Sequence, residues 1–312
     1  MHQSFRLLVA AHDTMIGPAF VRACRDRPGV TLCEVAAPRP DFESRSDVAK
    51  LFAASRPDWV VVAAGASGGI GRNQREPATL MRNNLLALVH CLEAAREAGA
   101  ARLLYLASSC VYPREAAQPM QANQLMTGPL EPTSEAFATA RLAGLALCRA
   151  YRRQHGLRFV GAIPSDVYGP GDSFSTEDSH VVSGMIRRMH EARQSGAEVF
   201  EVWGSGNQRR DFLYVDDLAE ACLVALDAYD GDQPINLGGG QDVAIRDLAE
   251  AVRDVVGYRG VLRFDSSRPD GAPRKTLDAS VIFGLGFRPH VTLREGLTGT
   301  YRWYTESTSE AH

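Results

Sequence analysis

Short apolar runs alternate with amphipathic stretches along the first half of the chain. Five runs have the nearly continuous apolar character of strands buried in a parallel sheet: 6–10, 30–35, 59–64, 101–107 and 159–163. Apolar residues recur at helical spacing in the intervals between them: 15–25, 47–55, 79–98 and 134–151. We expect Gly99 to end the third helix and Pro164 to end the fifth strand. This alternation predicts an α/β fold built on a doubly wound parallel sheet.

The last third of the chain has shorter elements. Strands are predicted at 199–202, 210–215, 235–238 and 261–264, and helices at 217–228 and 245–256. We therefore expect a Rossmann-like domain over 1–170 and a smaller C-terminal α/β lobe over 171–312. That lobe would serve mainly to bind substrate, with segments around 210–240 returning to the first domain. The Ser- and Glu-rich tail from Thr305 is expected to be frayed.

Composition limits the functions open to the chain. Of its 312 residues, 45% are hydrophobic and 23% charged, and the net charge of −3 argues against binding to nucleic acid or to a membrane surface. No apolar run approaches the roughly 18 residues of a membrane span, and the first residues lack a signal-peptide pattern, so a cytoplasmic location is expected. The six cysteines are scattered, without a CxxC pair or a metal-ligand cluster, which predicts reduced thiols and no metal site.

Eight segments carry a resemblance that covers nearly the whole chain. They follow the order of a known family: 68–70, 108–113, 130–133, 167–170, 179–181, 203–206, 215–217 and 269–275. Together they resemble GDP-L-fucose synthase, a member of the extended short-chain dehydrogenase/reductase superfamily. The resemblance implies a GDP-linked 4-keto-6-deoxy sugar as substrate, epimerisation at C3 and C5, and reduction at C4 with NADPH.

The cofactor loop departs from the pattern of the family. Of the glycines in the turn after the first strand, only Gly17 is kept, and Ala11 and Thr14 are expected to block the approach of a pyrophosphate to the backbone. Asp13 stands where the family has an arginine for the 2′-phosphate, and like charges about 4 Å apart repel by roughly 4 kcal/mol near a protein surface. We therefore expect that no cofactor is required and that NADPH binding is weak or lost. A remodelled loop that still holds NAD(H) is the alternative.

The reductase motif is altered as well. The Tyr-x-x-x-Lys of the family is Phe-Ala-Thr-Ala-Arg at 137–141. In the family, the tyrosine gives a proton to the C4 oxygen, and the lysine lowers the pKa of that tyrosine and holds the nicotinamide ribose. Phe137 has no hydroxyl, and Arg141 differs from lysine in shape and hydrogen bonding. We predict that reductase activity is lost, that Phe137 serves in packing, and that Arg141 faces solvent or substrate.

The residues for epimerisation are retained. Inversion next to a ketone requires one group to remove a proton and another to return one to the opposite face, which a thiolate and an imidazole do near neutral pH. The resemblance assigns these roles to Cys110 and His180. For the oxygen of the enolate, Ser108 matches the catalytic serine of the family, Ser109 is a second candidate donor and Arg141 a third. A buried structural cysteine is the alternative for Cys110.

Substrate-binding residues match the family too. Arg188, Arg210 and Lys275 stand where the family has cations near the nucleotide diphosphate and the sugar, and guanidinium groups suit phosphate oxygens. Trp203 offers an aromatic wall to the substrate or, alternatively, packs in the core of the lobe. Asn84 is a weaker candidate, because the family has Gln-Asn at this place.

These observations predict a nucleotide-sugar epimerase that inverts C3, C5 or both in a GDP-linked 4-keto-6-deoxy sugar or heptose, without hydride transfer. Two alternatives stay open. One is an NAD(P)H-dependent epimerase-reductase with an atypical proton donor, and the other is a non-catalytic paralogue that binds a nucleotide sugar. Since the family dimerises through two long helices of each subunit, we also expect a homodimer formed by 79–98 and 134–151.

Overall fold

Six parallel strands form the central sheet of the structure, a computed structural model that describes residues 4–10, 15–25, 27–35, 39–176, 179–267 and 271–309. The strand order is β2-β1-β3-β4-β5-β9, and every neighbouring pair is parallel. The strands are β1 (Phe5–Ala10), β2 (Val30–Leu32), β3 (Trp59–Val62), β4 (Arg102–Leu106), β5 (Arg158–Pro164) and β9 (Ile235–Leu237). From β1 the chain adds β2 on one side and then β3, β4, β5 and β9 on the other. This order confirms the predicted doubly wound α/β fold.

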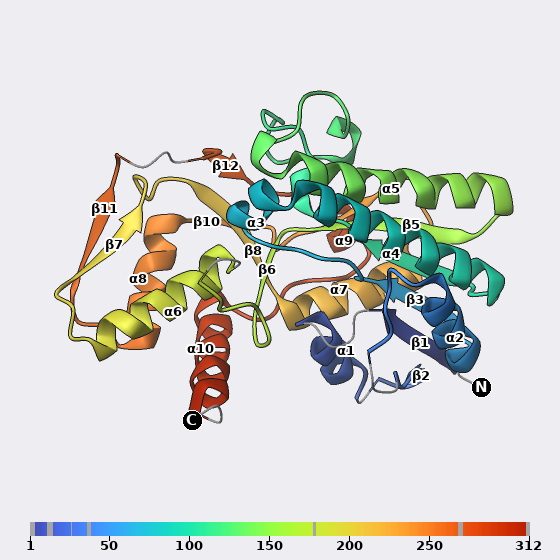
Figure 1. Cartoon of the computed structure of the whole chain (residues 1–312), viewed down its shortest axis with the longest axis horizontal. Helices are drawn as coiled ribbons and strands as arrows, with labels where there is room; N and C mark the ends of the chain where they lie inside the picture. Colours follow the sequence, from blue (N-terminus) through green and yellow to red (C-terminus); the bar gives the residue numbers. More distant parts are fainter. Residues whose placement is uncertain are drawn as a thin grey trace.

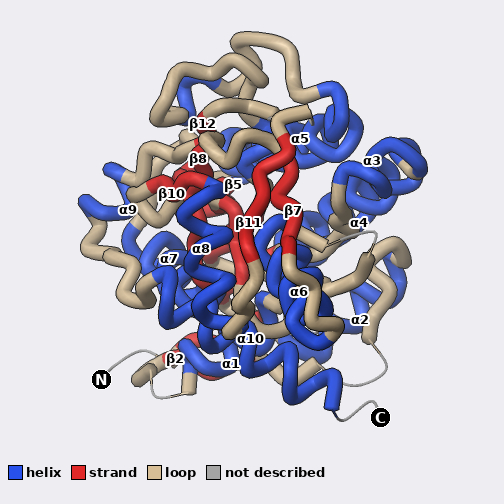
Figure 2. The backbone as a smooth tube through the Cα atoms, turned by 90° about the vertical axis from the view of Figure 1, so that its left-hand side faces the viewer, coloured by secondary structure: helices blue, strands red, loops and turns tan. Residues whose placement is uncertain are grey.

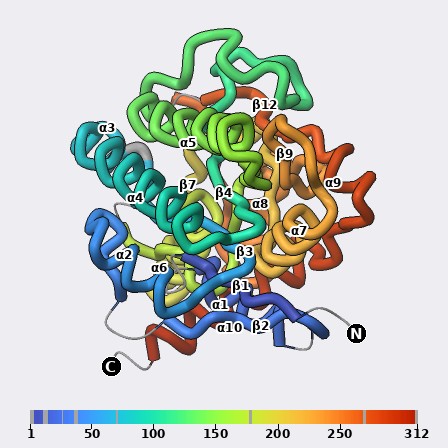
Figure 3. The backbone as a smooth tube through the Cα atoms, turned by 90° about the vertical axis from the view of Figure 1, so that its right-hand side faces the viewer, coloured from blue at the N-terminus to red at the C-terminus, as the bar shows by residue number. Residues whose placement is uncertain are grey.

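Two layers of helices cover the faces of this sheet. One layer contains α2 (Arg45–Ser55), α4 (Pro77–Glu97), with α3 (Ile70–Arg75) leading into it, and α5 (Glu135–His155). The other contains α1 (Ile16–Cys24), α7 (Val215–Ala228) and α9 (Ser280–Gly284). Figure 3 shows α4 and α5 on one side of the strands and α7 on the other. Because both faces are covered, all four residues of β3 are buried and apolar.

The remaining elements surround a third apolar cluster. Its helices are α6 (Val181–Gln194), α8 (Ile245–Val256) and α10 (Leu293–Ser309). In one small sheet β6 (Asp166–Tyr168), β10 (Asp242–Ala244) and β12 (Arg274–Lys275) pair with β8 (Arg209–Tyr214), and in another β7 (Val199–Trp203) pairs with β11 (Val261–Asp265). Helices α6 and α8 and strands β7 and β11 lie at one end of the molecule, at the left of Figure 1 and toward the viewer in Figure 2. A domain boundary near residue 170 stays a prediction.

Local predictions fared differently. Pro164 is the last residue of β5, so the fifth strand ends there as predicted, although the proline itself belongs to the strand. The tail from Thr305 remains helical to Ser309, since the preceding turn of α10 is fixed by a buried tyrosine. Helices α6 and α10 were not predicted. Within the described part of the chain, no helix is long and apolar enough to cross a membrane.

Candidate active site

Cys110 lies directly beyond the carboxyl end of β4. The strand ends at Leu106, and a short 3₁₀ turn, η1 (Ser109–Val111), follows. Ser108 caps this turn: its Oγ accepts hydrogen bonds from the Cys110 N–H at 3.5 Å and from the Cys110 thiol at 3.1 Å. Ser109 is buried and Ser108 is half-buried, so Ser108 presents the more accessible hydroxyl.

Accessibility separates Cys110 from the other thiols. All six cysteines lie in described residues, and five are buried whereas Cys110 is half-exposed. Burial raises the pKa of Cys24 to about 11 and that of Cys91 to about 12, so these thiols stay protonated near neutral pH. The alternative of a buried structural cysteine does not hold for Cys110.

A buried arginine lies against the same strand end. Arg141, on α5, is 6% exposed, and its Nη1 donates to the carbonyl oxygen of Leu106 at 3.1 Å and to Tyr105 Oη at 3.5 Å. The guanidinium carbon lies 5.0 Å from the centre of the Phe137 ring, a cation–π contact that gives the phenylalanine its packing role. Its Nε has no hydrogen-bond partner among the described residues. Arg141 therefore does not face solvent.

Asn84, on α4, is a second buried polar side chain close to this arginine. Its Nδ2 donates to the carbonyl oxygens of Ala66 and Leu80 at 2.8 and 2.7 Å, whereas its buried Oδ1 has no partner in the described residues. Gly65 has φ of +122°, and a Cβ there would lie 2.2 Å from Asn84 Oδ1 and 3.3 Å from Arg141 Nη2. Glycine thus lets the backbone beyond β3 approach both side chains.

A pocket of about 430 Å³ opens beside Gly65. It lies beyond β2 and β3, at the edge of the sheet where doubly wound folds bind nucleotides. Its lining includes the guanidinium groups of Arg39 and Arg72, which suit phosphate oxygens, and also the carboxylates of Asp41 and Glu43, which repel them. Gly17 is buried in the first turn of α1. The predicted contributions of Ala11, Asp13 and Thr14 lie outside the described residues.

His180 is held by a carboxylate. It precedes the first turn of α6, and its Nδ1 lies 3.0 Å from Oδ1 of Asp172. The Asp172 side chain is 4% exposed, whereas that of His180 is 47% exposed. The hydrogen bond to Asp172 raises the pKa of His180 against the opposing effect of burial, and the charge of Asp166 acts in the same direction as Asp172. Asp172 therefore stabilises the imidazolium form relative to an isolated histidine.

Asp166 brings two of the predicted cations toward this histidine. Its Oδ1 lies 3.9 Å from Nζ of Lys275. Arg210 is held by the carbonyl oxygen of Ala272 at 2.8 Å, and burial lowers the pKa of Arg210 while the charge of Asp166 opposes that shift. His180, Lys275 and Arg210 thus share one acidic neighbour.

Arg188 and Trp203 form a separate pair. The guanidinium carbon of Arg188 lies 4.9 Å from the Phe200 ring and 5.3 Å from the Trp203 ring, and its Nη2 donates to the carbonyl oxygen of Glu201 at 2.6 Å. Trp203 is 59% exposed, so it does not pack in the core of the lobe. The pair offers a cation and an aromatic face at the surface.

The two catalytic candidates stand at one edge of the main sheet. Cys110 follows β4, and β5, which pairs with β4 in parallel, leads directly into Asp166 and then to the loop that carries Asp172. The carboxyl ends of neighbouring parallel strands lie about 4.8 Å apart, so both groups of residues extend from the same edge.

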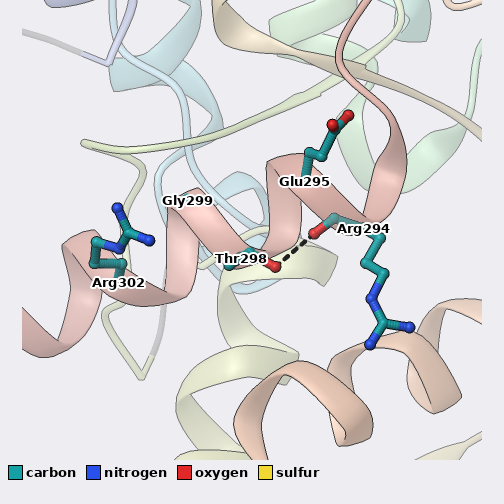
Figure 4. A pocket seen from close by; sticks show the side chains of 5 residues that line it. All are labelled: Arg294, Glu295, Thr298, Gly299 and Arg302. Carbon is teal, nitrogen blue, oxygen red and sulfur yellow. Dashed lines mark hydrogen bonds between the residues drawn. The ribbon is translucent and has the colours of Figure 1, made fainter.

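Another pocket, of about 390 Å³, lies on α10 and is lined by Arg294, Glu295, Thr298, Gly299 and Arg302 (Figure 4). The hydrogen bond drawn there, from Thr298 to the carbonyl oxygen of Arg294 at 2.7 Å, lies within the helix. None of the predicted site residues lines this pocket, and we place the candidate site at the sheet edge.

Comparison with known proteins decides the family. A model described as the NAD dependent epimerase/dehydratase family matches residues 8–238. The chain belongs to this family. GDP-L-fucose synthase 1 of Arabidopsis thaliana is 43% identical over 305 residues, which cover 98% of this chain and 94% of that protein. GDP-L-fucose synthase of Escherichia coli K12 is 39% identical over 311 residues, 97% of each.

Solved structures agree with this assignment to the epimerase/dehydratase family. A GDP-mannoheptose C4 reductase from Campylobacter jejuni with NADP bound is 26% identical, with a TM-score of 0.85 over 98% of this chain and 99% of that one. A GDP-L-fucose synthetase from Naegleria fowleri bound to NADP shares the fold, with a TM-score of 0.91 at 24% identity over 99% of this chain and 95% of that one. The resemblance to GDP-L-fucose synthases is confirmed.

The prediction that no cofactor is required is wrong. The matching family is NAD dependent, the relatives are GDP-L-fucose synthases, and the C. jejuni reductase holds NADP. The sequence argument relied on the residues 11–14, on Phe137 and on Arg141 in place of the lysine of the family. It did not foresee the pocket beside Gly65 or the burial of Arg141 on α5.

Several residues of the site were missed from the sequence. Asp172 follows the matching segment 167–170 by two positions, which was a usable signal, but its contact with His180 depends on how the loop folds. Arg39, Arg72 and Gly65 carry no motif. They line one pocket because the segments after β2 and β3, the two strands that flank β1, leave the same edge of the sheet.

Proposed function

We propose that the protein is an NADP(H)-dependent epimerase-reductase that acts on a GDP-linked 4-keto sugar. The observation that carries the proposal is the placement of an accessible thiol, Cys110, and a carboxylate-bound imidazole, His180, beyond adjoining strands of one sheet edge. The similarity to GDP-L-fucose synthases supports the choice of substrate and cofactor.

Proton exchange next to the ketone is assigned to these two side chains. Because Asp172 favours the imidazolium form of His180, this residue is suited to deliver a proton, and Cys110 as thiolate is suited to remove one. Negative charge then develops on the C4 oxygen, which the hydroxyl of Ser108 stabilises as a hydrogen-bond donor. Ser108 already contacts the thiol, so one turn holds both groups.

The pocket beside Gly65 fits the nucleotide part of NADP(H). Arg39 and Arg72 of its lining would hold the phosphates. Asn84 and Arg141, which adjoin Gly65 behind this lining, have buried polar atoms that would hold ribose hydroxyls. When bound, NADPH supplies the hydride for reduction at C4. The proton for that oxygen must come from a group other than Phe137, and the hydroxyl of Ser108 is our candidate.

The cations of the smaller sheets are assigned to the GDP-sugar. Arg210 and Lys275, both beside Asp166, would bind diphosphate or sugar oxygens. Arg188 and Trp203 would bind the phosphate and stack on the base.

A second candidate function, epimerisation without reduction, is favoured by one observation: Phe137 occupies the place of the tyrosine that donates the proton in the family. Incubation of the protein with GDP-4-keto-6-deoxymannose and NADPH distinguishes the two. We expect NADPH oxidation at about 1 s⁻¹ or faster and a sugar reduced at C4. Proton exchange without NADPH oxidation would contradict the reductase and favour the second candidate.

We also propose a homodimer through α4 and α5. Val89 on α4 is 45% exposed and Ala150 on α5 is half-buried, whereas Leu142 and Leu145 pack in or against the core. Apolar groups on the outer side of two long helices suit a symmetric contact. Light scattering at micromolar concentration should give twice the chain mass of 33.9 kDa, and a monomer would contradict the proposal.

A further inference from the structure

The turn between β6 and α6 holds a carboxylate in a fixed place. Gly169 has φ of +155° and Gly171 has φ of +87°, conformations that favour glycine, and the N–H of Asp172 donates to the carbonyl oxygen of Gly169 at 3.3 Å. Oδ1 of Asp172 accepts the N–H of Ser173 at 2.8 Å and faces Nδ1 of His180. The buried Oδ2 has no hydrogen-bond partner among the described residues.

We propose that Asp172 is the positioning residue of His180: its carboxylate binds Nδ1, fixes the plane of the ring and leaves Nε2 for the substrate. The exposure of the two side chains fits this role, because the carboxylate is 4% exposed and the imidazole 47%. A buried carboxylate that orients a more exposed imidazole is the arrangement that serves proton transfer in hydrolases. The inference rests on the proposed function, since it concerns the histidine assigned there to proton delivery.

Charge explains why the histidine needs this partner. His180 stands at the N-terminus of α6, where the helix dipole disfavours a cation by roughly 0.3–1 kcal/mol. Among the residues that the structure describes, the charged groups that raise the pKa of His180 are Asp172, from the preceding turn, and Asp166, from β6. Lys275 lies 3.9 Å from Asp166 and weakens the contribution of that carboxylate. Of these described groups, Asp172 is therefore the one that most stabilises the protonated form of His180.

A second Asp–His pair provides a matched control. Oδ1 of Asp217 lies 2.9 Å from Nδ1 of His290, and Asp217 is 1% exposed. Unlike Asp172, Asp217 uses both oxygens to accept backbone N–H groups, those of His290 and Val291 at 3.2 and 3.1 Å. This pair closes a loop, and its loss should lower stability without changing proton exchange.

The test measures deuterium incorporation into GDP-4-keto-6-deoxymannose in D₂O, without NADPH, between pH 6 and 9. For Asp172→Asn we expect at least a tenfold slower exchange at pH 8 and a basic limb moved to lower pH, since one pKa unit changes the imidazolium fraction about tenfold above the pKa. Asp172→Glu should recover part of the rate. Asp217→Asn should keep the wild-type profile.

Titration of His180 by NMR, with its signal assigned by comparison with His180→Gln, gives a second readout. We expect the pKa of His180 to fall in Asp172→Asn. Wild-type rate and pH profile in Asp172→Asn would overturn the inference. If that variant does not fold, a pKa of His180 at or below the ordinary value in the wild type overturns it instead. Wild-type protein that exchanges no protons would refute the proposed function, while the titration would still decide the pairing.

Discussion

Gly144 fixes how closely α5 approaches β4, and so where Arg141 and Phe137 lie. A Cβ at this glycine would come within 2.2, 2.4 and 2.7 Å of Cε1, Cζ and Oη of Tyr105. That ring is 1% exposed, and its hydroxyl contacts Arg141. Any movement that accommodates a methyl group must therefore displace the ring or the helix.

The magnitude for Gly144→Ala follows from two opposing effects. Alanine in a helix is favoured over glycine by about 1 kcal/mol. Overpacking in a filled core costs about 1–3 kcal/mol, and three contacts below 3 Å place this site at the upper end. We expect a net loss of about 2 kcal/mol in the free energy of unfolding, with slower turnover because Tyr105 and Arg141 shift together.

Urea unfolding followed by circular dichroism measures this loss, and Gly284→Ala is the matched control. A Cβ at Gly284, in α9, meets no atom within 4 Å. The control should be as stable as the wild type or up to about 1 kcal/mol more stable. A Gly144→Ala protein as stable as the wild type would refute the reasoning that helix and strand are in contact at this glycine.

Three further predictions follow from the site. Cys110→Ser should slow α-proton exchange by about 10²–10⁴-fold in an NMR assay, because a hydroxyl is a far weaker base than a thiolate; a smaller loss would show that another base acts. Arg141→Met should weaken NADP(H) binding in calorimetry. Its melting temperature should be unchanged or higher, since no carboxylate pairs with this buried cation among the described residues. Tight binding with a lowered melting temperature would contradict the role assigned to Arg141. Burial raises the pKa of Asp211 to about 7, so the stability that its protonated form contributes is present below about pH 4 and is lost as the pH rises toward 7. In urea unfolding, the free energy of unfolding of Asp211→Asn should depend less on pH over this interval. The same pH dependence in the variant and the wild type would exclude that titration.

Periodicity predicted the elements of the main sheet because they bury whole faces. β3 and the helices α4 and α5 have apolar residues at the spacing that their burial requires. Helix α10 was missed because Gly and Thr are frequent in its sequence and a tertiary contact stabilises it: Tyr304 stacks on Phe174 with centroids 4.6 Å apart. Helix propensity, which depends only on the residues of the segment itself, cannot predict that contact.

In the site, too, residues within motifs could be predicted from the sequence, whereas their tertiary contacts could not. Cys110 and His180 were found because each lies in a short segment that matches the family. The partner of His180 was not, since the approach of Asp172 depends on the conformations of Gly169 and Gly171 in the turn before it. Likewise, the burial of Arg141 follows from the packing of α5 on β4, which the spacing of residues along one helix cannot reveal.

Proton exchange with solvent tests the central claim most directly. The wild-type protein and the variants Cys110→Ser and His180→Gln are incubated with GDP-4-keto-6-deoxymannose in D₂O, and the sugar is followed by NMR. The account predicts deuterium at C3, at C5 or at both with the wild type, and loss of most of this exchange in each variant. Exchange at the wild-type rate in both variants would contradict the assignment of Cys110 and His180 as the proton-transfer groups.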